Sequence, residues 1–200
     1  PMARWGTALV TGASAGLGDV FARTLASEGT NLVLVARNGD RLESLADELR
    51  RTHAVEVEVL AADLTAPVPR SWVELRLGDD ERPIDLLVNN AGVGTFGRVK
   101  DLPVGCEDQE IQLNVVALMR LSATAATAMV SRGNGTIVNV GSVAAVAPSP
   151  GAATYAATKS FVLSYTESLH EELAGTGVGA TVCLPGLTPP FVGIPGVERS

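Results

Sequence analysis

Tyr155 and Lys159 carry side chains that can exchange protons, and they stand four residues apart in a segment with helical spacing. Side chains at this spacing project from the same face of a helix at neighbouring turns. A phenol has an ordinary pKa near 10, so about one molecule in a thousand is phenolate at pH 7. Lowering that pKa by about 3 units requires about 4 kcal/mol, which an ammonium about 4 Å away supplies at an effective dielectric near 20. The pair therefore predicts an acid/base tyrosine that Lys159 activates.

Ser142 adds a third functional group. It follows the apolar run Thr136–Gly141, at the carboxyl edge where open α/β sheets bind their ligands. A neutral hydroxyl there can donate a hydrogen bond to a substrate oxygen that gains charge in the transition state. Hydride reduction of a carbonyl, and the reverse oxidation of an alcohol, both need a proton moved at that oxygen. Singly, Tyr155 fits the rim of a helix and Lys159 a solvated charge; jointly with Ser142 they predict a catalytic site that needs no metal.

A glycine-rich turn, Thr11-Gly12-Ala13-Ser14-Ala15-Gly16-Leu17-Gly18, follows the first apolar run and opens a helical segment. Glycine permits the tight turn and a close approach of backbone to a phosphate, and the helix N-terminus supplies unpaired N–H groups. Any strand-to-helix connection can use glycine, so the turn alone leaves a nucleotide site and a purely structural role about equally favoured. Its position between a strand and a helix is what a phosphate-binding turn requires.

The Gly-x-x-x-Gly-x-Gly spacing of this turn resembles the short-chain dehydrogenase/reductase superfamily. Asn89-Asn90-Ala91-Gly92, Ser142 and Tyr155-x-x-x-Lys159 follow in the order and at about the intervals of that family, over nearly the whole chain. The resemblance implies an oxidoreductase that interconverts ketones or aldehydes and alcohols. It gives Lys159 a second role on the nicotinamide ribose hydroxyls, and it makes Asn114 a fourth catalytic residue that holds a proton-relay water. A buried asparagine that kinks or caps a helix is the alternative for Asn114.

The end of the second apolar run bears on the choice of cofactor. Ala36 stands where NAD-preferring relatives carry Asp, and Arg37 follows it; a basic side chain there pairs with the 2′-phosphate of NADP(H). Arg37 also fits an ordinary surface arginine, and Ala15 offers no second basic group. We expect NADP(H), with NAD(H) as the alternative. The resemblance assigns the cofactor to Gly12, Ser14, Ala15, Gly16, Leu17, Gly18, Arg37, Asp63, Leu64, Asn90, Ala91, Gly92, Tyr155, Lys159, Pro185, Gly186 and Thr188.

Short apolar runs alternate with helical segments along the chain, which predicts βαβ units and a parallel sheet. We expect residues 1–200 to form a single domain of the α/β class, a Rossmann-like doubly wound parallel sheet flanked by helices. The predicted strands are Ala8–Thr11, Asn31–Ala36, Val55–Ala61, Asp85–Asn89, Thr136–Gly141 and Ala180–Leu184. Helices are predicted near Leu17–Leu25 and Leu42–Leu49, within Thr65–Pro83, and over Gln109–Arg132 and Ala152–Ala174.

The composition of the chain limits the classes of partner that the protein is expected to bind. The net charge of −7 and the pI near 4.8 argue against a nucleic-acid surface, which needs clustered Lys and Arg. The apolar runs are strand-sized and no leader is evident, so we expect a cytoplasmic protein without a membrane span. Ala-rich surfaces on the long helices favour a homodimer or homotetramer.

The segments beside the catalytic residues are apolar, which predicts a hydrophobic small-molecule carbonyl or alcohol as substrate. They comprise Val93, Phe96, Val143, Ala144, Val146 and Pro148. Relatives continue into a substrate-covering lid, which is short or incomplete in a chain ending at Ser200. A catalytically impaired NADP(H)-binding regulatory or scaffold protein is therefore the alternative from another class. An epimerase or dehydratase fits less well, because such enzymes have a differently spaced glycine turn and a larger C-terminal domain.

Overall fold

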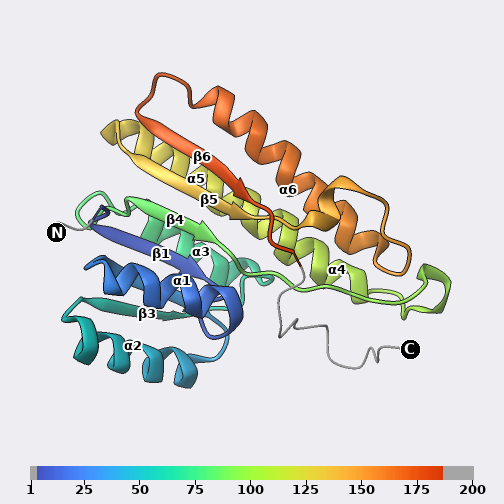
Figure 1. Cartoon of the computed structure of the whole chain (residues 1–200), viewed down its shortest axis with the longest axis horizontal. Coiled ribbons are helices and arrows are strands. Elements are labelled where there is room, and N and C mark those ends of the chain that lie inside the picture. The colour runs from blue at the N-terminus through green and yellow to red at the C-terminus, as the bar shows by residue number, and fades with distance from the viewer. Residues whose placement is uncertain (1–3, 187–200) are drawn as a thin grey trace.

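The apolar runs form one parallel sheet, shown as arrows in Figure 1. The computed structural model describes residues 4–186. The 6-stranded sheet has the order β3-β2-β1-β4-β5-β6, with every neighbouring pair parallel. Its strands are β1 Thr7–Thr11, β2 Asn31–Ala36, β3 Val57–Ala61, β4 Leu86–Asn89, β5 Gly135–Val140 and β6 Val178–Cys183. The predicted single Rossmann-like α/β domain is confirmed.

Helices connect the strands and cover both faces of the sheet (Figure 1). They are α1 Gly16–Ser27, α2 Gly39–His53, α3 Pro67–Leu77, α4 Cys106–Ile111, the π-helix η2 Gln112–Ala117, α5 Leu118–Arg132 and α6 Ala153–Glu172, with short 3₁₀ turns η1 Val99–Asp101 and η3 Val143–Val146. Successive strand residues point to opposite faces, so Ala8 and Val10 pack with α1 and α2. Leu9 packs with α3, α5 and α6. The chain thus has two cores, one on each side of the sheet.

Most element boundaries lie within one or two residues of the sequence prediction, and two of the differences are informative. The third strand begins at Val57 rather than Val55, because Ala54 adopts a left-handed conformation with φ of 55° and ends α2. The predicted helix Gln109–Arg132 begins earlier, at Cys106, and contains the π-helical turn η2. Such turns are rare and widen the helix locally, often at functional sites.

The continuous helix Cys106–Arg132 is long and apolar enough to cross a membrane, judged by length and composition alone, and an 18-residue stretch of it has a mean hydropathy of 1.5. Its C-terminal half lies against the sheet instead. Leu121, Ala125 and Met129 are each 1% exposed and belong to the core shared with α3 and α6. Packing beneath the sheet accounts for the apolar character of these residues.

All strands run the same way, so their carboxyl ends meet at one edge of the sheet (Figure 1). The glycine-rich turn follows β1, Arg37 follows β2, Asn90 follows β4 and Ser142 follows β5. The topology therefore gathers residues that are distant in sequence at a single edge. Strand β1 lies between β2 and β4, which is the switch point where open α/β sheets leave room for a ligand.

Candidate active site

The turn between β1 and α1 can be built only with glycine at specific places. Gly12 and Gly16 have φ values of 66° and 59°, in the left-handed region where a Cβ is strained. At Gly18 the constraint is contact: an added Cβ would lie 2.2 Å from the Gly12 carbonyl oxygen and 2.6 Å from Asn90 Nδ2. The first turn of α1 therefore packs directly on the loop before it.

The segment after β4 is bound to this turn by hydrogen bonds. Thr11 Oγ1 accepts from the backbone N–H groups of Asn90 and Ala91, each at 3.0 Å, and Asn90 Nδ2 donates to the Thr11 carbonyl at 3.0 Å. Gly92 extends this segment toward the catalytic residues, because a Cβ there would lie 3.2 Å from Asn114 Oδ1 and 3.4 Å from Lys159 Nζ. The predicted cofactor turn and the predicted catalytic residues thus form one continuous site.

Helix α6 carries Tyr155 in its first turn and Lys159 one turn later, as the spacing predicts. Lys159 Nζ donates to the Val140 carbonyl at 2.8 Å and lies 5.8 Å from the centroid of the Tyr155 ring. Ser142 caps η3 by accepting from the Ala144 N–H at 3.2 Å, and a side-chain hydrogen bond joins it to Tyr155. The three predicted catalytic groups therefore meet at the carboxyl edge.

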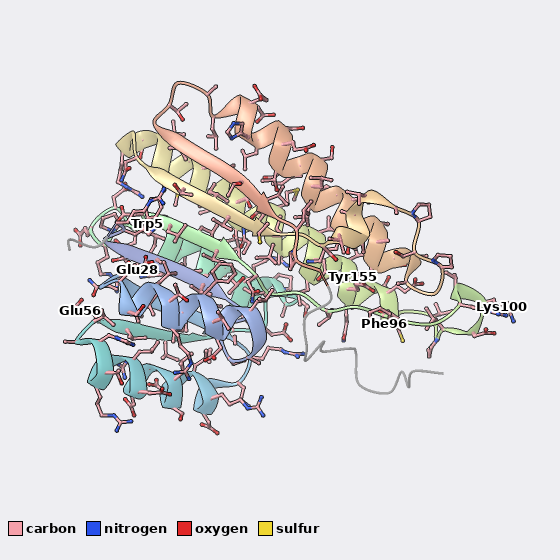
Figure 2. The ribbon with its side chains drawn as sticks, viewed as in Figure 1. Trp5, Glu28, Glu56, Phe96, Lys100 and Tyr155 are labelled. Carbon is pink, nitrogen blue, oxygen red and sulfur yellow. The ribbon has the colours of Figure 1, made fainter. Side chains whose placement is uncertain are left out.

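Figure 2 shows Tyr155 beside Phe96 at this edge, while Trp5, Glu28 and Glu56 lie toward the opposite end of the strands. The Phe96 and Tyr155 ring centroids are 6.1 Å apart with the rings tilted by 44°, a geometry typical of aromatic pairs. Phe96 therefore gives the phenol an apolar neighbour.

The charge state of the pair differs from the expectation that Lys159 lowers the pKa of Tyr155. Burial raises the pKa of the Tyr155 phenol above its ordinary value, and the hydrogen bond from Ser142 only partly opposes this. Lys159 is itself 4% exposed, and burial lowers its pKa to about 8. The expected direction for the pKa of Tyr155 was wrong, because loss of water destabilises the phenolate, and the ammonium as well. Tyr155 is consequently a neutral proton donor at pH 7.

Asn114 occupies the π-helix η2 and is 1% exposed. Its Oδ1 accepts from the Val93 N–H at 3.0 Å, and its Nδ2 donates to the Val93 carbonyl at 2.8 Å and to Thr158 Oγ1 at 3.1 Å. The side chain therefore ties the segment after Gly92 to the residue preceding Lys159. The structure places Asn114 in the site as a hydrogen-bonded cross-link between these two segments. Its proton-relay role stays a prediction.

The N-terminus of α1 has the features that a pyrophosphate requires. Its N-cap residue Ala15 makes no side-chain cap hydrogen bond, so the first N–H groups point outward from a positive helix end. An added Cβ at Gly16 would meet nothing within 4 Å, which leaves space where a ligand can contact the backbone. Ser14 and Leu17 are half-buried beside this opening. The turn fits a dinucleotide phosphate group.

The remaining predicted cofactor contacts differ in their support. Arg37 is exposed and makes no ion pair within residues 4–186, so its guanidinium is available to a phosphate. Asp63 Oδ1 accepts from the Thr65 N–H at 3.0 Å in a turn, the ordinary role of such an aspartate, and Leu64 is buried. Pro185 accepts from the Val143 N–H at 3.1 Å, which holds Gly186 near Ser142. Thr188 lies outside the described residues.

Several buried polar residues were not found by sequence reasoning. Glu110 has no exposed surface and accepts from the Thr95 N–H at 3.0 Å. A second group cross-links β4, β5, α5 and α6 beneath the site: Asn89 Nδ2 donates to Ser122 Oγ and Asn139 Oδ1, and Asn139 Nδ2 donates to Thr166 Oγ1. Asparagines inside the apolar runs of β4 and β5 were the available signal for this network.

The fold and the site define a class of protein. The family model of the short chain dehydrogenases matches residues 6–192, and the chain belongs to this family. It is 34% identical over 198 residues to a short chain dehydrogenase of Pseudocercospora fijiensis, covering 94% of this chain and 62% of that protein.

Two solved structures are similar to it. A short-chain dehydrogenase from Sphingobium yanoikuyae, in complex with NADPH, is 44% identical with a TM-score of 0.87, over 90% of this chain and 70% of that one. The bulky-bulky ketone specific alcohol dehydrogenase from Comamonas testosteroni is 41% identical with a TM-score of 0.87, over 90% and 72%. The chain thus spans less than two thirds of the fungal relative and about seven tenths of each of these enzymes.

Proposed function

We propose that this protein is an NADP(H)-dependent oxidoreductase that interconverts a hydrophobic ketone or aldehyde and the corresponding alcohol. The observation that carries the proposal is the meeting of Ser142, Tyr155 and Lys159 at the sheet edge that also holds the glycine turn. Family membership and the NADPH complex of the Sphingobium protein support it.

Each catalytic side chain has a defined part in the reduction. NADPH, when bound, supplies the hydride. The Ser142 hydroxyl donates to the carbonyl oxygen, and Tyr155 transfers its phenolic proton to that oxygen as negative charge develops. Burial keeps Tyr155 protonated at neutral pH, which is the state that reduction requires. Lys159 places a positive charge behind the phenol and stabilises the phenolate that remains.

Arg37 is the proposed determinant of the preference for NADP(H) over NAD(H). It is exposed immediately after Ala36, the last residue of β2. A guanidinium pairs with a phosphate through parallel charge-assisted hydrogen bonds, and no acidic side chain occupies position 36 to repel that phosphate.

The apolar surface beside Tyr155 supports a hydrophobic substrate. Phe96 contacts the Tyr155 ring, and Val143 and Val146 are 50% and 67% exposed. These side chains follow the catalytic Ser142 on η3 and offer apolar area that a substrate would cover. Val146 also lines an open hollow of about 600 Å³ between η3 and α6, which Ser142, Tyr155 and Lys159 do not line, and this hollow is not assigned to the reacting group of the substrate.

The outer face of α5 and α6 supports self-association. Val130 and Met119 are 40% and 38% exposed there, and the Phe161 and Tyr165 rings stack on α6 with centroids 5.5 Å apart. Pairing this face across a two-fold axis would bury apolar area on both copies. We expect a dimer or tetramer by light scattering, which Val130→Arg shifts toward the monomer.

The test is NADPH and NADH binding measured beside turnover on a panel of ketones, aldehydes and secondary alcohols, for the parent and Tyr155→Phe. We expect both proteins to bind NADPH and only the parent to turn over. Binding without turnover in the parent contradicts the enzyme and favours the regulatory or scaffold alternative. Turnover confined to small charged compounds contradicts the hydrophobic substrate.

A further inference from the structure

Glu110 is a carboxylate with no exposed surface, located on α4 beneath the catalytic pair. Its Oε2 accepts from the Thr95 N–H at 3.0 Å, and the Thr95 side chain is a second hydrogen-bonding neighbour of this carboxyl group. Its Oε1 has no further hydrogen bond of normal geometry within residues 4–186. Burial of a carboxyl group with a single residue as its partner is costly, because the loss of water is incompletely compensated. The position of Glu110 therefore calls for an explanation beyond holding one loop.

Lys159 presents the complementary problem. It is 4% exposed, and its ammonium donates to a backbone carbonyl of Val140. No carboxylate lies within ion-pair distance of it in the part of the chain that the structure describes. Buried charges are ordinarily balanced by an opposite charge. The helices that carry Glu110 and Lys159 contact one another, so the two uncompensated charges share one interior.

The titratable groups around Glu110 come from two elements. On α6, Tyr155 and Lys159 interact with its charge; on α4, Glu107 is the other acid, and it accepts from the Thr154 hydroxyl. Burial is the largest influence on the pKa of Glu110, Tyr155 and Lys159 alike. The Glu110 charge also raises the pKa values of Tyr155 and Lys159, and Lys159 acts on the pKa of Glu110 in the opposite direction to burial.

We propose that Glu110 is a positioning residue of the active site, the buried negative charge that balances the Lys159 ammonium and adds to the effect of burial in holding Tyr155 in its proton-donating form. Its bond to Thr95 also holds the segment that presents Phe96 to Tyr155. The inference rests on the proposed function, because it concerns the same two catalytic side chains. Glu110 itself touches neither substrate nor cofactor.

The composition of the chain allows a direct test without turnover. Its lysines are Lys100, which is exposed, and Lys159, so protein labelled with ¹³C at lysine Cε reports both by NMR. Glu110→Gln keeps an oxygen that can accept from Thr95 and removes the charge. We expect the pKa of Lys159 to fall from about 8 by about one pH unit, while Lys100 is unchanged.

Tyr155 supplies a second readout. The chain has 2 tyrosines, so a Tyr165→Phe background leaves Tyr155 as the only phenol, and its ionisation follows from phenolate absorption. Glu110→Gln lowers the pKa of this phenol as well. In a catalytically active protein, the pH profile of kcat moves to lower pH by a similar amount, whereas a merely structural role would change kcat without moving the profile.

Asp108→Asn is the matched control, since it removes the same charge from an exposed position of α4 where solvent screens it. Glu110→Asp keeps the charge and should restore most of the parental titration. If Glu110→Gln does not fold, the parent alone decides: the Lys159 signal must show a second inflection at acid pH, where Glu110 takes up its proton.

The proposal is overturned if Lys159 and Tyr155 titrate unchanged in Glu110→Gln, if Asp108→Asn shifts them equally, or if the parent shows no second inflection. None of these outcomes depends on turnover. A protein that reduces no carbonyl would contradict the proposed function and leave this test intact.

Discussion

Gly16→Ala separates the structural role of the glycine turn from its cofactor role. Gly16 has φ of 59°, and an added Cβ there would meet no atom within 4 Å. The substitution therefore adds backbone strain of about 1–2 kcal/mol but no clash. For a chain of 200 residues each kcal/mol lowers Tm by about 2–4 °C. The methyl group enters the space assigned to the pyrophosphate and disrupts charge-assisted hydrogen bonds worth about 1.5–3 kcal/mol. We expect NADPH binding to weaken by about 10–100-fold.

Gly175→Ala provides the matched control. Gly175 follows α6, has φ of 79°, and likewise has nothing within 4 Å of an added Cβ. Both variants should lose similar stability in thermal unfolding, whereas only Gly16→Ala should lose affinity in calorimetric titration with NADPH. Parental NADPH affinity in Gly16→Ala would refute the placement of the phosphates, and an equal loss in Gly175→Ala would show that stability alone explains the effect.

Three further predictions follow from single side chains. Arg37→Ala should weaken NADPH binding by about 10–100-fold and leave NADH binding unchanged, since only NADPH carries the 2′-phosphate; equal losses for both cofactors would contradict the assignment, and Arg51→Ala is the surface control. Asn114→Ala should lower the free energy of unfolding by about 3 kcal/mol in urea titrations, because the Val93 backbone groups and the Thr158 hydroxyl lose their partner. A loss below about 1 kcal/mol would contradict the cross-linking role of Asn114. Because burial places the pKa of Lys159 at about 8 against 10.5 in the unfolded chain, the unfolded state binds more protons between these values and this group's contribution to the free energy of unfolding rises with pH there, by about 3 kcal/mol in total. Lys159→Met should remove that rise, which urea titrations of both proteins at pH 8 and pH 10.5 check; a variant that kept the rise would contradict the prediction.

The fold was largely predictable because its signals are local. Apolar runs of strand length alternate with helical periodicity, and glycine lies where α1 and α5 end, at Gly29 and Gly133 with φ of 84° and 68°. Boundaries were less predictable where one residue decided between conformations, as at Ala54, whose left-handed backbone ends α2 and delays β3. The π-helical turn at Gln112–Ala117 also has no local sequence signature, because the hydrogen bonds of Asn114 to Val93 and Thr158 are tertiary contacts.

The site was predictable as a set of residues and less so as an electrostatic environment. Ser142, Tyr155 and Lys159 were located by spacing and by position after a strand, both of which sequence reports directly. Burial depends on what packs around them, and sequence offered no way to place Glu110 beneath α6. A glutamate between Gln109 and Ile111 is most simply expected on a solvated face, so a buried carboxylate that raises the pKa values of both Tyr155 and Lys159 was missed.

Burial also explains why the pKa of Tyr155 is raised, although the spacing of the pair predicted that Lys159 would lower it. An ammonium 4 Å away would lower the phenol pKa if it kept its hydration and charge. Here the same low-dielectric surroundings that strengthen the attraction also raise the pKa of Tyr155 and lower that of Lys159 to about 8. The protein alone therefore holds the pair as a neutral phenol and a partly protonated amine near pH 8. A neutral phenol can donate the proton that the proposed reduction requires, whereas the oxidation requires the phenolate, so the burial of this pair favours the proton-donating role of Tyr155.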